Sequence, residues 1–300
     1  MPESKKIRVV THSSSFHTDD VFAVATTLLY LEKQGKQAEV IRSRDKEVIN
    51  SGNYVMDVGD VYNPEINRFD HHQYGGAGVR ENGIPYASFG LVWKKFGEEL
   101  CGSKKISEEI DIEIVQPIDG PDNGYGFMKS SIPGVFSFDI GLLTFLFTPT
   151  WKEKNADLYQ IFMKLVSHAK VILERRIKVG QDDLEAEKIV IDTYNRSQDK
   201  RLIITEEGYP WESVLNSFPE PLFVIYENRD KNWTIKAVRS EQNSFDLRKK
   251  LPENWAGKRD LELEKITHVS GANFCHMKRF MAVNKTKEGI LKMAEIALGE

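Results

Sequence analysis

Residues Ile7 to Asp20 read IRVVTHSSSFHTDD, an apolar stretch followed by a polar loop that is rich in histidine and aspartate. The apolar part predicts a β-strand, and the periodicity of the residues that follow predicts a helix over Asp20 to Lys33. Two more apolar runs, Ala38 to Ile41 and Tyr54 to Met56, predict further strands. Strands that alternate with a helix in this way indicate an α/β fold with a mainly parallel sheet flanked by helices.

The composition is that of a globular chain. Its 300 residues are 40% hydrophobic and 29% charged, which is enough for two domains with cores of their own. The net charge of -4 argues against a protein coated in positive charge, so contact with nucleic acid would need a local basic patch. Cys101 and Cys275 fit neither a disulfide framework nor a paired-cysteine zinc site, which favours a reducing compartment. With a polar start and no long apolar run, we expect a cytoplasmic protein without a membrane partner.

The second half of the chain has a different texture. A helical pattern over residues 156–195, which we expect to be interrupted at Gly180, is long for a globular helix and predicts a link between two domains. The aromatic run Phe136 to Phe147 before it is predicted to be buried in a core. Short strand patterns and a closing helix then predict a smaller α+β domain, so we place the domains at 1–198 and 199–300.

Histidines and aspartates gather where the predicted strands end. His12 and His17 flank the loop after the first strand, and Asp57 ends the third. The carboxyl ends of the strands in an open α/β sheet meet at one edge, where ligands bind. Imidazole and carboxylate groups are ligands of divalent metals, and a cation relieves the repulsion between carboxylates. We expect Asp19 to be a ligand, Asp20 to support it, and Asp57 to bridge two cations as in two-metal hydrolysis.

The tripeptide Asp70-His71-His72 adds two imidazoles and a carboxylate. Neighbouring side chains diverge, so one histidine is expected to bind metal and the other to meet a phosphate oxygen, while Asp70 orients His71. Asp119 and the segment Asp122-Asn123-Gly124 follow a predicted helix and supply the remaining acidic ligand, although Asp-Asn-Gly is also an ordinary turn sequence. The whole inventory is typical of a metal-dependent phosphoesterase.

These motifs resemble those of the DHH phosphoesterase superfamily, and as a set they are similar to the Myg (melanocyte-proliferating-gene) family of DHH-like metal-dependent hydrolases. They span positions 11 to 289, nearly the whole chain. One departure is His17, where the superfamily's first motif usually has an aspartate. The matching segments are Thr11-His12, Phe16-His17-x-Asp19, Asp57, Arg68-Phe69-Asp70-His71-His72-Gln73, Ile118-Asp119, Asp122-Asn123-Gly124, Leu251-Pro252-Glu253-x-Trp255, Phe274-Cys275-His276 and Lys285-Thr286-Lys287-Glu288-Gly289.

The resemblance implies a DHH-type catalytic domain, a C-terminal substrate-binding domain, and two divalent ions, Mn²⁺ or Mg²⁺. It further implies 3′ to 5′ exonuclease activity, with single-stranded RNA or a short oligonucleotide as partner. The oligomeric state is left open, and a homo-oligomer is one option. Carried over by motif, the ligands of one ion would be His12, His17 and Asp57, and those of the other would be Asp19, Asp57, His71 and Asp119.

The same carry-over assigns the remaining roles. His72 would contact the scissile phosphate and act in catalysis together with Asp57 and His71, with Asp20, Asp70 and Asp122 supporting the ligands. Substrate would be bound in the second domain by His276, Lys278, Arg279 and Lys285. Two other functions stay open: hydrolysis of a small phosphoester such as pyrophosphate, a cyclic dinucleotide or a nucleoside phosphate, and a non-catalytic metal- or nucleotide-binding module.

Overall fold

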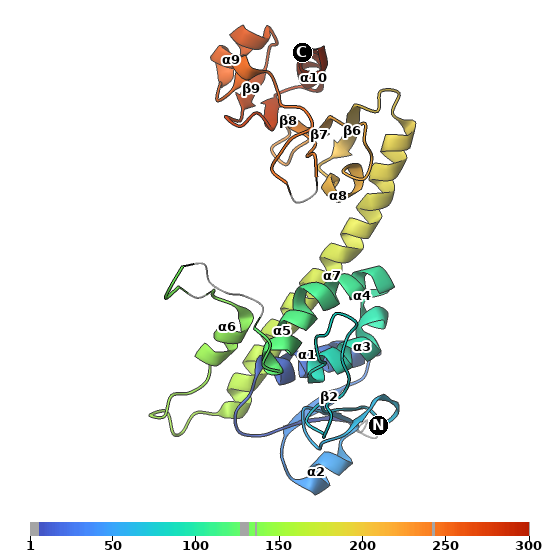
Figure 1. Cartoon of the computed structure of the whole chain (residues 1–300), viewed down its shortest axis with the longest axis vertical. Coiled ribbons are helices and arrows are strands. Elements are labelled where there is room, and N and C mark those ends of the chain that lie inside the picture. The colour runs from blue at the N-terminus through green and yellow to red at the C-terminus, as the bar shows by residue number, and fades with distance from the viewer. Residues whose placement is uncertain (1–5, 127–131, 136, 242–243, 300) are drawn as a thin grey trace, which may run out of the picture. The chain divides into compact units, whose positions relative to one another are not determined.

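The chain forms two compact units, Met1–Gln181 and Asp182–Glu300, each built around a five-stranded sheet (Figure 1). The computed structural model describes residues 6–126, 132–135, 137–241 and 244–299. The α/β class predicted from the sequence is therefore confirmed. Helix α7 (Leu158–Arg196) passes from the first unit into the second, and the domain limits 1–198 and 199–300 remain a prediction.

The first sheet places β1 (Ile7–Thr11) between two parallel neighbours, β2 (Ala38–Arg42) and β3 (Tyr54–Met56). Beyond β3 lie the parallel β5 (Arg68–Phe69) and the antiparallel edge strand β4 (Tyr62–Asn63). The three longer strands confirm the prediction from apolar runs, whereas two-residue strands are too short to leave a pattern in the sequence. Because β1, β3 and β5 run parallel, their carboxyl ends meet at one edge of the sheet.

Helices α1 (Thr18–Lys33) and α3 (Ser88–Cys101) pack against this sheet and against each other. Helix α1 begins at Thr18, two residues earlier than predicted, and His17 is its N-cap residue. The other helical segments of the first unit are α2 (Lys46–Ser51), a 3₁₀ turn (Pro64–Ile66), α4 (Lys104–Ile110), a π-helical turn (Asp111–Val115), α5 (Gln116–Asp122) and α6 (Ile140–Leu146).

The aromatic run around α6 is exposed, so the prediction that it is core is wrong for its described residues. Phe138 and Phe145 are each 68% exposed, and Phe136 lies outside the described residues. Within α6 only Thr144 is buried, and its hydroxyl accepts a hydrogen bond of 3.0 Å from Thr18 Oγ1 on α1. An apolar run in the sequence indicates that its residues are hydrophobic, but not which way their side chains point. Here α6 contacts α1 through the polar side chain of Thr144.

Helix α7 is continuous, so the interruption predicted at Gly180 is also wrong. A Cβ at this position would lie 2.7 Å from Ile106 Cγ2 of α4. The glycine thus serves a close approach between two helices instead of ending one. None of the described helices combines the length and apolar character needed to cross a bilayer.

The second unit is α+β, as predicted. In its sheet β6 (Leu202–Glu207) and β7 (Phe223–Glu227) are parallel, and β8 (Trp233–Ala237), β10 (Met281–Asn284) and β9 (Ala272–Cys275) follow in antiparallel order. Buried side chains of this sheet and of α10 share one core. The helical segments are α8 (Glu212–Leu215), a 3₁₀ turn (Glu253–Trp255), α9 (Asp260–Thr267) and α10 (Lys287–Gly299).

Candidate metal centre

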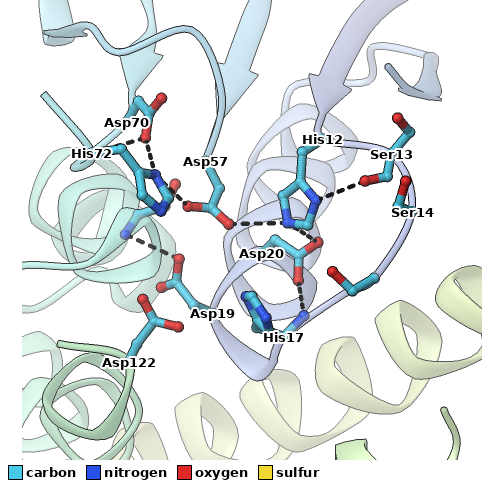
Figure 2. Close-up of polar contacts among 12 residues, drawn as sticks. His12, Ser13, Ser14, His17, Asp19, Asp20, Asp57, Asp70, His72 and Asp122 are labelled. Carbon is cyan, nitrogen blue, oxygen red and sulfur yellow. Dashed lines mark hydrogen bonds and ion pairs between the residues drawn. The ribbon is translucent and has the colours of Figure 1, made fainter. Parts of the chain in front are cut away.

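Three of the four parallel strands are followed by an acidic or imidazole side chain at the shared edge of the sheet. His12 follows β1, Asp57 follows β3, and Asp70 follows β5 (Figure 2). The backbone of Asp57 has a φ of +56°, in the left-handed region that residues other than glycine seldom adopt. Such backbone strain costs about 1 to 3 kcal/mol and clusters at functional sites. The structure thus brings these side chains together at the edge of the sheet, as predicted.

His12 is buried and presents one ring nitrogen to carboxylates. Its Nδ1 lies 3.1 Å from the carbonyl oxygen of Ser13, which can only accept, so Nδ1 carries a hydrogen. Its Nε2 lies 3.2 Å from Asp20 Oδ2 and 3.2 Å from Asp57 Oδ2. Among the described residues no hydrogen bond reaches the buried Oδ2 of Asp20. A nitrogen lone pair that faces two carboxylates in this way suits a divalent cation.

Asp57 links two sets of metal-capable side chains. One set is His12, His17 and Asp57, and another is Asp57, His71 and His72; in each set the nearest ligand atoms lie within 4.8 Å of one another. Asp57 Oδ1 is 3.3 Å from His71 Nε2, while Oδ2 faces His12. This is the position that a bridging carboxylate would occupy, although bridging itself stays a prediction.

Backbone groups orient the two acidic residues at the start of α1. The carboxylate of Asp19 accepts from Phe89 N–H at 2.7 Å and from Ser88 N–H at 3.1 Å, where α3 begins. Asp20 Oδ1 accepts from the backbone N–H of His17 at 2.8 Å. Both side chains are buried, so each is held in one place before any ligand arrives.

The protonation behaviour of the cluster reflects its crowded negative charge. Burial raises the pKa of Asp19 well above its ordinary value, and the Asp57 carboxylate adds to the shift. Burial also raises the pKa of Asp20 to about 7, against the pull of His12. Burial acts to lower the pKa of His71, but hydrogen bonds to the surrounding carboxylates outweigh it and raise the value to about 11. Bound protons therefore compensate negative charge that a bound cation would otherwise compensate. These residues fit a divalent metal.

The two histidines of the Asp70-His71-His72 segment have different surroundings. Asp70 Oδ1 is 2.7 Å from His72 Nδ1 and also accepts the backbone N–H of His72, and Asp70 Oδ2 accepts that of Asp60 at 2.6 Å. Asp70 thus orients His72, and not His71 as expected from the sequence. The side chain of His72 is 56% exposed, while that of His71 is 7% exposed, so only His72 is open to a substrate.

Asp119 and Asp122 lie in different environments although both belong to α5. Asp119 is fully buried, and its Oδ2 lies 2.7 Å from the Nη2 atom of Arg80. Asp122 Oδ2 lies 3.3 Å from His71 Nε2 and forms a metal-capable set with Asp19 and His71. Arg80 was not singled out in the sequence, because a lone arginine in a loop leaves no pattern there.

A cavity of about 490 Å³ opens on this edge of the sheet. Besides the predicted residues it is lined by Arg44 and Lys46, two exposed cations that follow β2. The sequence reasoning missed both, although their place just after a parallel strand was a usable signal. The lining is completed by His12, His17, Ile49, Asn50, Asp57, Val58, Gly59, Asp60, Asp70 and His72.

The substrate-binding residues predicted in the second unit lie around strands β9 and β10. His276 follows β9, and its Nδ1 accepts the backbone N–H of Lys278 at 3.0 Å. Arg279 adopts a left-handed φ of +62° in the same turn, and the exposed Lys285 follows β10. Their part in substrate binding stays a prediction.

The fold and this edge define an α/β protein with a candidate site for divalent metal. The MYG1_exonuc family model, described as "Uncharacterised protein family (UPF0160)", matches residues 8–298, and the chain belongs to this family. A MYG1 protein of Dictyostelium discoideum is 33% identical, across 96% of this chain and 95% of its own length. A protein of Mus musculus named MYG1 exonuclease is 29% identical, across 98% of this chain and 85% of its own length.

Two solved structures show a weaker likeness. RecJ from Thermus thermophilus in complex with Mg²⁺ has a TM-score of 0.29 at 10% identity, covering 98% of this chain and 50% of that one. An exonuclease RecJ bound to manganese has a TM-score of 0.27 at 9% identity, covering 97% of this chain and 89% of that one. These scores are too low to support an argument about mechanism, so the family rests on the sequence matches.

Proposed function

We propose that this protein is a divalent-metal-dependent phosphodiesterase that acts as a 3′ to 5′ exonuclease on single-stranded RNA or short oligonucleotides. The observation that carries the proposal is the carboxylate of Asp57, shared between two metal-capable sets at the wall of a cavity. Arg44 and Lys46 line the same cavity, which favours a polyanionic substrate. The name MYG1 exonuclease, borne by relatives from mouse and human, supports a nuclease.

The metal-capable side chains suit two ions, Mn²⁺ or Mg²⁺. His12, His17 and Asp57 would hold one, and Asp19, Asp57 and His71 would contribute to the other. When bound, such ions activate water near neutral pH and stabilise charge on phosphate oxygens. Asp119, which the motif assigned to the second ion, is paired with Arg80.

His72 is the side chain best placed to act on the substrate. Its hydrogen bond to Asp70 raises its pKa, which favours the imidazolium. With Nδ1 engaged by Asp70, the other ring nitrogen remains to donate to a phosphate oxygen. The fixed, half-exposed ring therefore supports the assignment of His72 as a catalytic residue and of Asp70 as the group that orients it.

The second unit would bind the strand that is being degraded. His276, Lys278, Arg279 and Lys285 carry donors and positive charge, which suit a phosphate backbone. In this proposal residues 1–198 form the metal-binding catalytic domain and residues 199–300 form the substrate-binding domain. We also propose a cytoplasmic protein, and a homo-oligomer remains compatible with all these roles.

A second candidate function is hydrolysis of a small phosphoester. A cavity of about 490 Å³ suits a compact ligand such as a mononucleotide or a dinucleotide. The site chemistry would be the same, and only the length of the substrate would differ.

One assay separates the two candidates. Single-stranded RNA of about 20 nucleotides with a 5′ label is incubated beside pyrophosphate and a linear dinucleotide, with Mn²⁺ or with EDTA. We expect a ladder of shortened labelled products that requires both Mn²⁺ and Asp57, and an unchanged ladder in the matched control Asp230→Ala, at an exposed turn. Cleavage of the small substrates alone would establish the second candidate, and full activity of Asp57→Ala would remove the shared carboxylate from the mechanism.

A further inference from the structure

We infer that Asp122, and not Asp119, supplies the last carboxylate ligand of the metal centre, and that Asp119 is a positioning residue held by Arg80. The inference rests on the proposed function, since it concerns the metal site on which that function depends. It departs from the motif assignment, in which Asp119 is the ligand and Asp122 supports it. The two aspartates are three residues apart on α5, so the sequence motif alone does not distinguish them.

Asp122 faces the metal-capable groups. Its Oδ2 is 3.3 Å from His71 Nε2, and both belong to a set with Asp19 whose ligand atoms lie within 4.8 Å of one another. Two ligands on opposite sides of a cation with bonds of about 2.1 Å stand about 4.2 Å apart, so small side-chain shifts would close the set around one ion. His71 Nε2 lies 3.3 Å from Asp122 Oδ2 and 3.3 Å from Asp57 Oδ1, so a cation that replaced its proton would meet carboxylates on both sides.

Asp119 is already engaged on both sides. Its Oδ1 accepts the backbone N–H of Gly90 at 3.0 Å, and its Oδ2 lies 2.7 Å from Arg80 Nη2. Arg80 is fixed in turn by Asp111, through contacts of 2.8 and 3.1 Å, and stacks over the ring of Tyr86 at 4.1 Å. A guanidinium in direct contact with this carboxylate would repel a divalent cation bound to the same group.

The space around Asp119 points to the same role. A Cβ at Gly90 would lie 1.9 Å from Asp119 Oδ2, so the carboxylate occupies room that only a glycine on α3 leaves free. The backbone carbonyl of Asp119 also accepts hydrogen bonds from Asn123, through its backbone N–H at 3.1 Å and its side chain at 2.8 Å. Anchoring Asp119 to α3 and Arg80 therefore sets the position of the last turn of α5, which carries Asp122. The Oδ2 atom of Asp122 lies 3.3 Å from His71 Nε2, and Figure 2 shows Asp122 beside Asp19.

Calorimetric titration of the chelator-treated protein with Mn²⁺ tests this assignment without any substrate. We expect Asp122→Asn to weaken binding of one Mn²⁺ at least about tenfold, with the melting temperature of the metal-free protein unchanged or higher. Asp119→Asn should lower that melting temperature by about 5 °C or more, because it leaves the charge of buried Arg80 partly uncompensated. Asp230→Asn, in the exposed turn, is the matched control and should change neither quantity.

A double variant separates positioning from ligation. Arg80→Gln combined with Asp119→Asn restores a neutral hydrogen-bonding pair, so we expect it to regain stability and to keep both Mn²⁺ sites. Loss of one Mn²⁺ in this double variant, or full Mn²⁺ binding by Asp122→Asn, would overturn the inference while leaving the proposed function intact. A wild-type protein that binds no Mn²⁺ would instead overturn the proposed function, and the inference with it.

Discussion

Replacing Gly90 by alanine should destabilise the first unit, although alanine is the better helix former. A Cβ at this position would lie 1.9 Å from Asp119 Oδ2 and 2.7 Å from Arg80 Nη2, so the buried ion pair would have to move. Breaking such a pair costs about 3 to 5 kcal/mol, whereas the change from glycine to alanine inside a helix contributes about 1 kcal/mol. The expected loss in the free energy of unfolding is therefore about 2 to 4 kcal/mol.

Urea denaturation of the metal-free protein, followed by circular dichroism, measures this loss. Gly141→Ala is the matched control, because Gly141 also lies in a helix and its new Cβ would come no closer than 3.3 Å to a neighbour, Asp139 Oδ1. The control should be as stable as wild type or slightly more stable. If Gly90→Ala is also as stable as wild type, the carboxylate of Asp119 does not fill the space beside Gly90 and its role as an anchor fails.

His276→Ala should raise KM for RNA several-fold with little change in kcat, and an unchanged KM would remove this residue from substrate binding. Saturating Mn²⁺ should raise the melting temperature, since a ligand at 100 times its Kd stabilises by about 2.7 kcal/mol, and EDTA should reverse the shift. Burial raises the pKa of Cys101 and of Cys275 to about 11. Thiol titration at pH 8 should therefore detect both cysteines only after unfolding. The contribution of the two buried thiols to the free energy of unfolding is fully present below pH 9 and is lost as the pH rises toward 11.

Local patterns in the sequence were sufficient for the framework of the site. The apolar runs at β1, β2 and β3 and the helical period of α1 each depend on neighbours along the chain, so they could be identified without a structure. Parallel order then places the residues after β1 and β3 at one edge, which is why His12 and Asp57 were expected together, whereas Asp70 was recognised from its Asp-His-His tripeptide and not from a predicted strand. The same reasoning could have included Arg44 and Lys46 after β2.

Other features depend on contacts between residues that are distant along the chain, and only the tertiary structure decided them. The apolar run at α6 is exposed, and this helix contacts α1 through a threonine hydroxyl. Asp70 orients His72 because its Oδ1 contacts both the Nδ1 atom and the backbone N–H of that residue. Asp119 and Asp122 have the same chemistry and differ only in what surrounds them. Arg80 and Gly90 lie outside α5. The charge of Arg80 and the space beside Gly90 hold Asp119 as an anchor, whereas Asp122 faces the metal-capable groups.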